Sequence, residues 1–218
     1  MVPAKLQFQS WFASPIVLTQ HPDPSRLNAE LETLFLARET EEFRNKFASH
    51  IPQAELFESK FSVFNWPERC VLELRTFMLQ NVGAAVAHLN GYTPEEMSKL
   101  TLQNHTWFHV MRHGASFVAH NHPNASWSAV YCVRAGEAVA GRPDSGALRF
   151  LDHRPGSNAF LDAGNSSFRR EFCFGHQVLS LVPGQLIMFP AYLVHEVATF
   201  LGRDHRITVA SNCWFTPR

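Results

Sequence analysis

Hydrophobic residues recur at helical spacing in the first part of the chain and alternate with polar residues in the second part. Residues 22–47 open with Pro-Asp-Pro-Ser, in which Asp23 or Ser25 can cap a helix. A second helical pattern starts at Pro67 and runs to Gly91. The pattern therefore predicts two helices. Their apolar stripes are Leu27, Leu31, Leu34 and Phe35 in the first, and Val71, Leu74, Met78, Val82 and Ala85 in the second.

From about residue 101 onward, short apolar runs alternate with polar positions and are separated by Gly, Pro, Asn and Asp. This pattern is typical of antiparallel strands joined by turns. It predicts about eight strands, the number that a jelly roll uses. The expected strands are 106–111, 117–122, 127–133, 147–151, 177–181, 185–189, 193–199 and 207–215.

We therefore expect a mainly β protein, with a jelly-roll core covered on one outer sheet face by two N-terminal helices. A chain of 218 residues fits one domain of this kind. Within that single domain, residues 1–100 form the helical support and residues 101–218 form the jelly-roll core.

The charge of the chain disfavours two classes of partner. It carries 19 basic and 19 acidic residues, so it lacks the excess of positive charge that binding to a nucleic-acid backbone requires. No run approaches the ~20 apolar residues that span a bilayer, and the opening MVPAKLQFQSWF is too short and polar for a secretory signal. The expectation is a soluble cytoplasmic protein that binds neither nucleic acid nor membrane, with an unspecified oligomeric state.

Histidine is unusually frequent, with twelve residues against three tyrosines. His120 and His122 end a predicted strand, where a period of two puts both side chains on one face. A third, His195, follows a strand and a corner that contains Pro190. A jelly roll can bring it beside the first two. Three imidazoles on one side of a metal ion leave its other positions open, as redox or Lewis-acid chemistry requires.

Arg206 and Thr208 share one face at the start of the last predicted strand, eleven and thirteen residues after His195. An arginine beside a metal can hold a carboxylate through two parallel hydrogen bonds, and the threonine hydroxyl can add a third. The pair suits a dicarboxylate cosubstrate. The alternative is a solvated arginine at a strand end, held in an ordinary ion pair.

Other polar and aromatic residues are weaker candidates. Tyr131 lies nine residues past His122, and its hydroxyl either reaches a bound carboxylate or simply packs in the core. Ser128 and Asn212 are candidates of the same kind, although both can serve only to satisfy buried backbone groups. Trp107 is expected in the core or in a pocket wall, with the core favoured.

His105, His109 and His113 do not form a second metal site in this interpretation. In a strand, residues four positions apart are separated by about 13 Å, which is too far for one ion.

Five runs of the sequence together resemble a bacterial branch of the iron(II)- and 2-oxoglutarate-dependent oxygenases. They are WFHVMRHG from Trp107, HNHPNASWSAVYCV from His120, GALRF from Gly146, PGQLIMFPAYLVHEV from Pro183 and RITVASN from Arg206. The resemblance covers roughly residues 100–215 directly. Singly each motif is weak, whereas the combination is specific.

The resemblance implies a double-stranded β-helix, Fe(II), 2-oxoglutarate and O2 as cosubstrates, and hydroxylation of an unactivated C–H bond. The substrate would be a small molecule or an amino-acid or peptide side chain. It implies His120 and His195 as metal ligands, with Arg206 and Thr208 on the distal carboxylate of 2-oxoglutarate. The chain departs from the common pattern at His122, where most members have Asp or Glu, and we expect this third imidazole to bind the metal too.

A neutral third imidazole has two consequences. It leaves the full charge of Fe²⁺ in place, which dianionic 2-oxoglutarate would balance. It also makes the site less selective, because three-histidine sets suit Zn²⁺ and Cu²⁺ as well. Two alternatives therefore stay open: a cupin-like three-histidine dioxygenase without 2-oxoglutarate, and a three-histidine zinc hydrolase or lyase. The expected pocket loops, 134–145 and 153–176, do not name a substrate.

Overall fold

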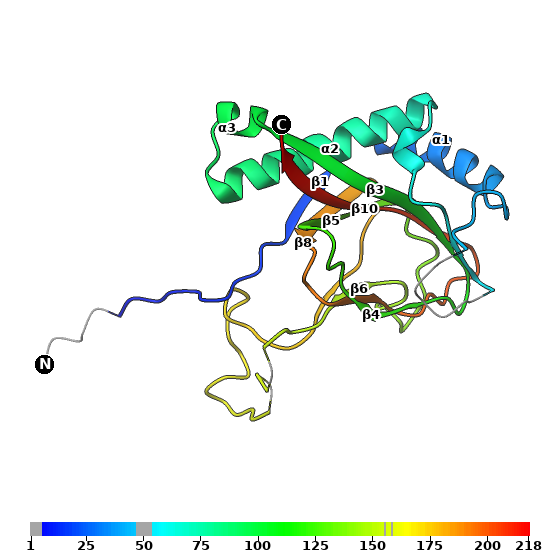
Figure 1. The fold of residues 1–218 in the computed structure, drawn as a ribbon. Helices are drawn as coiled ribbons and strands as arrows, with labels where there is room; N and C mark the ends of the chain where they lie inside the picture. Colours follow the sequence, from blue (N-terminus) through cyan, green and yellow to red (C-terminus); the bar gives the residue numbers. More distant parts are fainter. Residues whose placement is uncertain (1–5, 47–53, 155, 158) are drawn as a thin grey trace, which may run out of the picture.

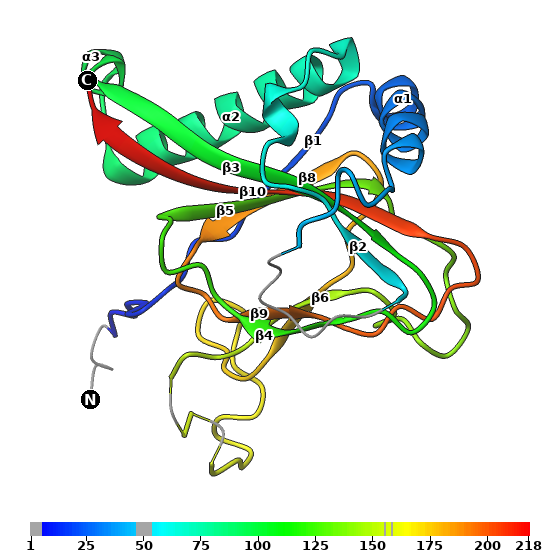
Figure 2. The same ribbon diagram turned by 45° about the vertical axis from the view of Figure 1, so that its right-hand side comes forward.

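The computed structural model describes residues 6–46, 54–154, 156–157 and 159–218. Two antiparallel sheets face each other (Figures 1 and 2). The larger has the strand order β1-β8-β5-β10-β3-β2, and the smaller has the order β4-β9-β6-β7. The strands are β1 Val17–Gln20, β2 Leu56–Glu58, β3 Leu100–Met111, β4 Phe117–His120, β5 Trp127–Arg134, β6 Leu148–Phe150, β7 Gln177–Leu179, β8 Gln185–Pro190, β9 His195–Val197 and β10 Arg206–Pro217.

Two helices, α1 (Pro24–Ala37) and α2 (Arg69–Asn90), cover the outer face of the larger sheet (Figure 2). Pro24 occupies the first turn of α1, where its missing N–H costs nothing. Gly91 ends α2 in the left-handed conformation at φ 69°, which glycine adopts without strain. A 3-10 turn, η1 (Val63–Asn65), precedes α2, and the short α3 (Pro94–Ser98) follows it.

The main hydrophobic core lies between these helices and the larger sheet. Leu31 and Leu74 of the two helices are fully buried, as are Phe108 and Val209 of the sheet. Each such side chain contributes roughly 1.5–3 kcal/mol through burial. Because successive residues of a strand point to opposite faces, the other face of this sheet is left to face the smaller sheet. That inner space holds the candidate site.

The first helix is shorter than the sequence pattern predicts. It ends at Ala37, and residues 40–46 form turns and one isolated bridge, between Arg44 and Ser59, instead of continuing the helix. The predicted end, residue 47, lies outside the described residues. The guanidinium of Arg38 stacks 4.1 Å from the ring centroid of Trp66 and pairs with Glu68. The segment after Leu36 is mostly charged, so it offers no stripe that could bury against the sheet. The second helix agrees with its prediction.

All eight predicted strands are present, and the described residues contain two more. β1 and β2 come from the N-terminal hundred residues and form the two edges of the larger sheet. The predicted helical support thus supplies strands as well. β3 starts at Leu100, before the predicted start at residue 106. The prediction missed the first half of this strand because that half is polar and partly exposed and lacks a strong apolar alternation.

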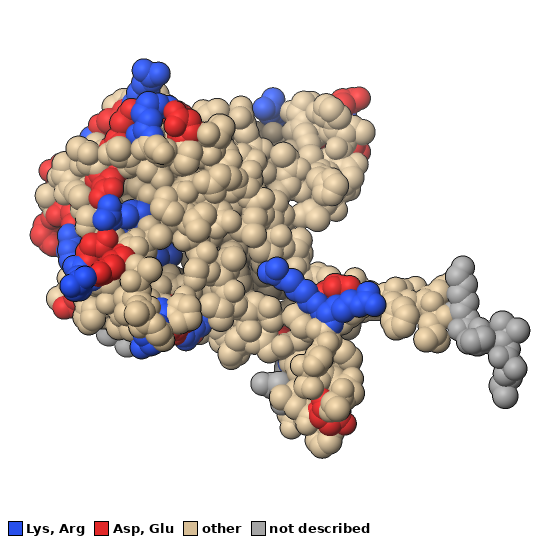
Figure 3. Space-filling model, turned by 180° about the vertical axis from the view of Figure 1, so that it is seen from behind, with Lys and Arg blue, Asp and Glu red and all other residues tan. Residues whose placement is uncertain are grey.

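Within the part of the chain that the structure describes, no helix combines the length and the apolar character that crossing a membrane requires. On the face drawn in Figure 3, basic and acidic residues are interspersed, and that face carries no continuous band of one sign.

Candidate active site

A cavity of about 530 Å³ opens between the two sheets. Its floor and walls come from β4 and β9 of the smaller sheet and from the inner faces of β3, β5 and β10. Alternation decides which side chains enter it. In β10 the even-numbered residues from Arg206 to Trp214 line the cavity, whereas Ile207 and Val209 point into the helix-side core.

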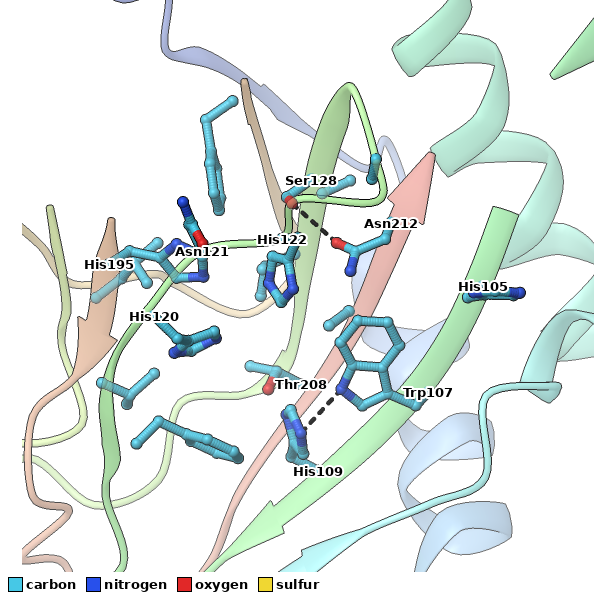
Figure 4. A pocket seen from close by; sticks show the side chains of 18 of the residues that line it. His105, Trp107, His109, His120, Asn121, His122, Ser128, His195, Thr208 and Asn212 are labelled. Atoms are coloured by element: carbon cyan, nitrogen blue, oxygen red, sulfur yellow. Dashed lines mark hydrogen bonds between the residues drawn. The ribbon is translucent and has the colours of Figure 1, made fainter. Parts of the chain in front are cut away.

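Three histidines converge in this cavity (Figure 4). His120 of β4 and His195 of β9 are direct partners across an antiparallel pair, with ring centroids 4.5 Å apart. His122 lies in the turn after β4, where its backbone N–H donates to the carbonyl of Ala191. Its ring centroid is 5.0 Å from that of His120 and 5.2 Å from that of His195. The ligand nitrogens of the three rings lie within 4.8 Å of one another.

Hydrogen bonds and burial prepare these imidazoles to bind a metal. The Nδ1 of His120 lies 2.7 Å from the carbonyl of Val118, and the Nδ1 of His195 lies 2.9 Å from the carbonyl of Leu193. A carbonyl only accepts, so each Nδ1 carries the proton and each Nε2 keeps a free lone pair. Burial lowers the pKa of His195 to about 4. Both rings therefore present Nε2 as the ligand atom, and His195 is set as a neutral ligand.

His122 is held differently. Burial, together with the neighbouring His195 and His120, lowers the pKa of His122 to about 3. The indole of Trp107 meets this ring edge-on, with the centroids 6.1 Å apart. The donor set is thus three imidazoles, which suits Fe²⁺ and other late divalent metals.

Arg206 lies in the same cavity and is buried. Its Nη1 contacts the sulfur of Met111 and the hydroxyl of Thr208, both at 3.4 Å. No described carboxylate forms an ion pair with it. Burial raises the pKa of the nearby Cys132 thiol to about 11, so this thiol is neutral and does not balance the guanidinium. An unbalanced buried cation is costly, which indicates that an anion binds here.

The structure thus brings together five of the six predicted site residues. The three histidines, Arg206 and Thr208 all line one cavity. The alternative of a solvated Arg206 in an ion pair is wrong.

Tyr131 is the exception, and its assignment to the cosubstrate needs correction. Its side chain lies on the opposite face of β5, in the core under the helices, and its hydroxyl donates to the Oδ1 of Asn28. One residue of offset along a strand reverses the face, so Tyr131 does not reach the cavity.

We predict that Tyr131→Phe lowers the free energy of unfolding by about 1–3 kcal/mol, because it leaves the buried Oδ1 of Asn28 without its donor. The affinity for 2-oxoglutarate should not change. Urea denaturation and calorimetric titration with 2-oxoglutarate would measure the two effects. Weaker cosubstrate binding at unchanged stability would contradict this placement of Tyr131.

Trp107 lies in the cavity wall, which was the less favoured of its two expected places, and its indole N–H donates to the Nε2 of His109 at 2.9 Å. Sequence reasoning missed two other residues of the wall. The carboxylate of Glu58 in β2 lies 3.0 Å from the same nitrogen. Phe61, after β2, lines the outer part. No motif marks Glu58 or Phe61, because only the pairing of β2 with β3 brings them to the site.

The three histidines excluded as a second metal set do not gather. His105 and His109 line different parts of the cavity, and the Nδ1 of His113 contacts the carbonyl of Leu201. Among the described residues, the only group of three or more metal-binding side chains is the one formed by His120, His122 and His195.

Comparison with known families agrees with this geometry. Residues 105–212 match a family model described as "Putative 2OG-Fe(II) oxygenase". None of the curated protein sequences is similar enough to count as a relative.

Solved structures agree in fold. A prolyl-4-hydroxylase from Pseudomonas putida is 18% identical, with 93% of this chain and 92% of that chain covered at a TM-score of 0.54. SnoN, an α-ketoglutarate-dependent epimerase of nogalamycin biosynthesis, is 14% identical, with 96% and 80% covered at 0.59. A prolyl hydroxylase from Trichoplax adhaerens, solved with a peptide fragment, is 12% identical, with 91% and 83% covered at 0.52.

The two facing sheets, with the three histidines between them, have the double-stranded β-helix fold of these structures. The chain belongs to the 2-oxoglutarate- and Fe(II)-dependent oxygenases, which use Fe(II), 2-oxoglutarate and O2.

Proposed function

We propose that this enzyme hydroxylates an unactivated C–H bond of a small molecule or of an amino-acid or peptide side chain. In this proposal His120, His122 and His195 hold Fe(II), and Arg206 with Thr208 binds the distal carboxylate of 2-oxoglutarate. One observation carries it: a buried arginine without a carboxylate partner among the described residues shares its cavity with three clustered imidazoles. Bound iron would supply the activation of O2 and the oxidising power.

The residues of the chain provide binding, orientation and charge balance. The carbonyls of Val118 and Leu193 fix the ring orientations of His120 and His195, so their Nε2 lone pairs need no rearrangement. The guanidinium of Arg206 presents two parallel N–H donors, the geometry that matches a carboxylate. Burial excludes competing water and strengthens that pair.

Electrostatics favours 2-oxoglutarate in particular. With three neutral ligands, the ion contributes two positive charges and Arg206 contributes a third. A dianion that reaches from the metal to the guanidinium offsets most of this charge in a low-dielectric cavity. If a carboxylate replaced His122, the protein itself would neutralise part of this positive charge.

The two alternative functions explain Arg206 less well. A three-histidine dioxygenase without 2-oxoglutarate, or a zinc hydrolase or lyase, has no anion for the buried guanidinium to bind. A buried charge without a partner costs several kcal/mol, and folding would not retain it without compensation.

The test uses the whole protein with Fe(II) and 2-oxoglutarate. Anaerobic mixing should produce a visible charge-transfer absorption that depends on both components. Under air, succinate should form at a rate that rises with a suitable member of a substrate panel. A colourless mixture at high protein concentration, together with no succinate, would overturn the proposal. A cytoplasmic location stays a prediction from the sequence.

We predict that His122→Asp retains iron, whereas His122→Ala binds it at least ten-fold more weakly. An aspartate offers an oxygen ligand from the same turn, and alanine offers none. Iron content after dialysis, measured by inductively coupled plasma spectrometry, would compare the two variants with the wild type. Equal iron in both variants would remove His122 from the ligand set.

A further inference from the structure

Four aromatic rings form a continuous strip along the outer half of the cavity. The indole of Trp107 is nearest the histidines, and the ring of Phe61 lies 4.7 Å from it, centroid to centroid. The imidazole of His105 stacks 6.4 Å from Phe61 and meets Trp214 edge-on at 4.9 Å. All four rings line the cavity. We call these four residues the aromatic strip.

The strip is partly open to solvent. Phe61 is 45% exposed, His105 is exposed and Trp214 is half-buried. It follows the ribbon of β3 and β10, which pair with each other along twelve residues. β5 pairs with β10 only as far as Cys213, so the end of the ribbon that carries Trp214 continues beyond β5. Trp107 is buried at the inner end of the strip, whereas the other three rings are open enough to stack on a ligand.

One polar group is directed into this outer half. The hydroxyl of Ser128 donates to the Oδ1 of Asn212 at 2.8 Å and thereby fixes the orientation of the amide (Figure 4). The Nδ2 of Asn212 then faces the cavity, and no described residue accepts a hydrogen bond from it. A fixed N–H donor without a protein partner suits a carbonyl oxygen of a ligand.

Formal charge is nearly absent from the wall. Among the described residues that line the cavity, the only Lys, Arg, Asp or Glu are Arg206 and Glu58. Arg206 lies at the inner end and is assigned to the cosubstrate. Glu58 accepts a hydrogen bond from Asn45 and contacts His109. The outer half therefore offers no cation to an anionic substrate.

We propose that the aromatic strip and Asn212 form the substrate site, and that the substrate is an uncharged, elongated molecule with apolar rings and a carbonyl oxygen. This inference rests on the proposed function, since it names the substrate class of the same site. The rings stack on the strip, and Asn212 donates to the carbonyl. Trp214 pairs with Gln103, which precedes Trp107 by four residues in β3. The two indoles are therefore separated by roughly 13 Å along the paired strands. That length accommodates more than one ring.

Binding of capped probes to the full-length protein, loaded with Zn(II) and 2-oxoglutarate, tests the substrate class without turnover. The probes are acetyl-Phe-Gly-Phe-amide, its Leu and Glu counterparts, N-benzylacetamide and benzyl alcohol, each titrated by calorimetry. The Phe peptide or N-benzylacetamide should bind most tightly, with about a two- to ten-fold advantage over the Leu peptide for each stacked ring. The Glu peptide should bind most weakly. If the Phe peptide binds more tightly than N-benzylacetamide, the ring belongs to a peptide side chain. If N-benzylacetamide binds more tightly, the ring belongs to a small molecule.

Variants assign the binding to named residues. Trp214→Ala and Phe61→Ala should each weaken ring-bearing probes about two- to ten-fold, whereas Trp11→Ala, which removes a 73% exposed indole outside the cavity, should not. Asn212→Ala should weaken N-benzylacetamide but not benzyl alcohol. Circular dichroism would confirm folding of each variant.

Two outcomes would overturn the inference: no preference for rings, or equal binding by the Trp214→Ala and Trp11→Ala variants. Titration of each Zn(II)-loaded protein with 2-oxoglutarate, carried out before the probes are added, separates this failure from failure of the proposed function. Intact cosubstrate binding with no preference among the probes rejects only the substrate class. Absent cosubstrate binding rejects the proposed function.

Discussion

His195→Ala is expected to weaken metal binding at least about 100-fold and to abolish succinate formation. Of the three clustered histidines His195 is the most buried, at 5% exposure, and its Nδ1 is fixed by the carbonyl of Leu193. Its removal leaves two imidazoles from β4 and the following turn, with no ligand from β9. Loss of even an outer-shell partner of a metal ligand typically costs 10–100-fold in affinity, so loss of the ligand itself costs at least as much.

The matched control for this variant is His88→Ala. His88 is exposed on the last turn of α2, outside the cavity, so its removal changes histidine content without touching the site. Calorimetric titration with Fe(II) under nitrogen and detection of succinate by mass spectrometry would compare both variants with the wild type. Far-UV circular dichroism would confirm that each is folded. Metal affinity within about three-fold of the wild type for His195→Ala would contradict its role as a ligand.

The position of a helix can be predicted from the sequence where its buried residues form a long apolar stripe. α2 shows this, because its stripe from Val71 to Ala85 is buried and a glycine ends it. The end of α1 could not be predicted in this way, because the helix ends where Arg38 contacts Trp66 and Glu68. Such contacts join residues about thirty positions apart, and local periodicity carries no information about them.

The site was predictable to the extent that its residues carry rare chemistry. Few folds require three imidazoles and one guanidinium at this spacing along the chain. These side chains belong to His120, His122, His195 and Arg206. The reason given for His122 was incomplete, because β4 ends at His120 and the turn, not strand alternation, directs the third ring inward. The convergence itself is confirmed by geometry.

Tyr131 shows the limit of that approach. The sequence indicates that successive side chains of β5 point to opposite faces of the sheet. It does not indicate which of these faces is directed toward the histidines. In the structure Ser128 and Val130 line the cavity, so Tyr131 faces the helices. The faces of different strands are related only through their pairing, and pairing such as Tyr131 with Leu186 is a property of the whole sheet.

Glu58 and Phe61 were not predictable for a related reason. They lie in or just after a three-residue edge strand, and the pairing of Phe57 with Val110 brings that strand to the cavity. Strands this short carry too few residues for an alternation pattern. Substrate contacts supplied by peripheral segments of a fold are therefore the part of a site that sequence reasoning finds last.

Arg206→Met is expected to weaken 2-oxoglutarate binding while it stabilises the ligand-free protein. Loss of the charged donors should cost roughly 1.5–3 kcal/mol of binding, or about ten- to 150-fold in Kd. Without 2-oxoglutarate, the guanidinium is a buried cation with no described carboxylate partner, which opposes folding. A methionine of similar length fills the space without that charge, so the free energy of unfolding should rise.

The opposite signs of these two effects distinguish a cosubstrate-binding arginine from a structural one. The matched control is Arg134→Met in the neighbouring strand, because Arg134 forms ion pairs with Asp204 and Glu32. That variant should lose some stability and keep its affinity for 2-oxoglutarate. Calorimetric titration with 2-oxoglutarate in the presence of Zn(II), and urea denaturation of the ligand-free variants, measure the two quantities. If Arg206→Met instead destabilised the ligand-free protein and bound 2-oxoglutarate like the wild type, the guanidinium would have a structural role, and the case for a dicarboxylate in this cavity would fail.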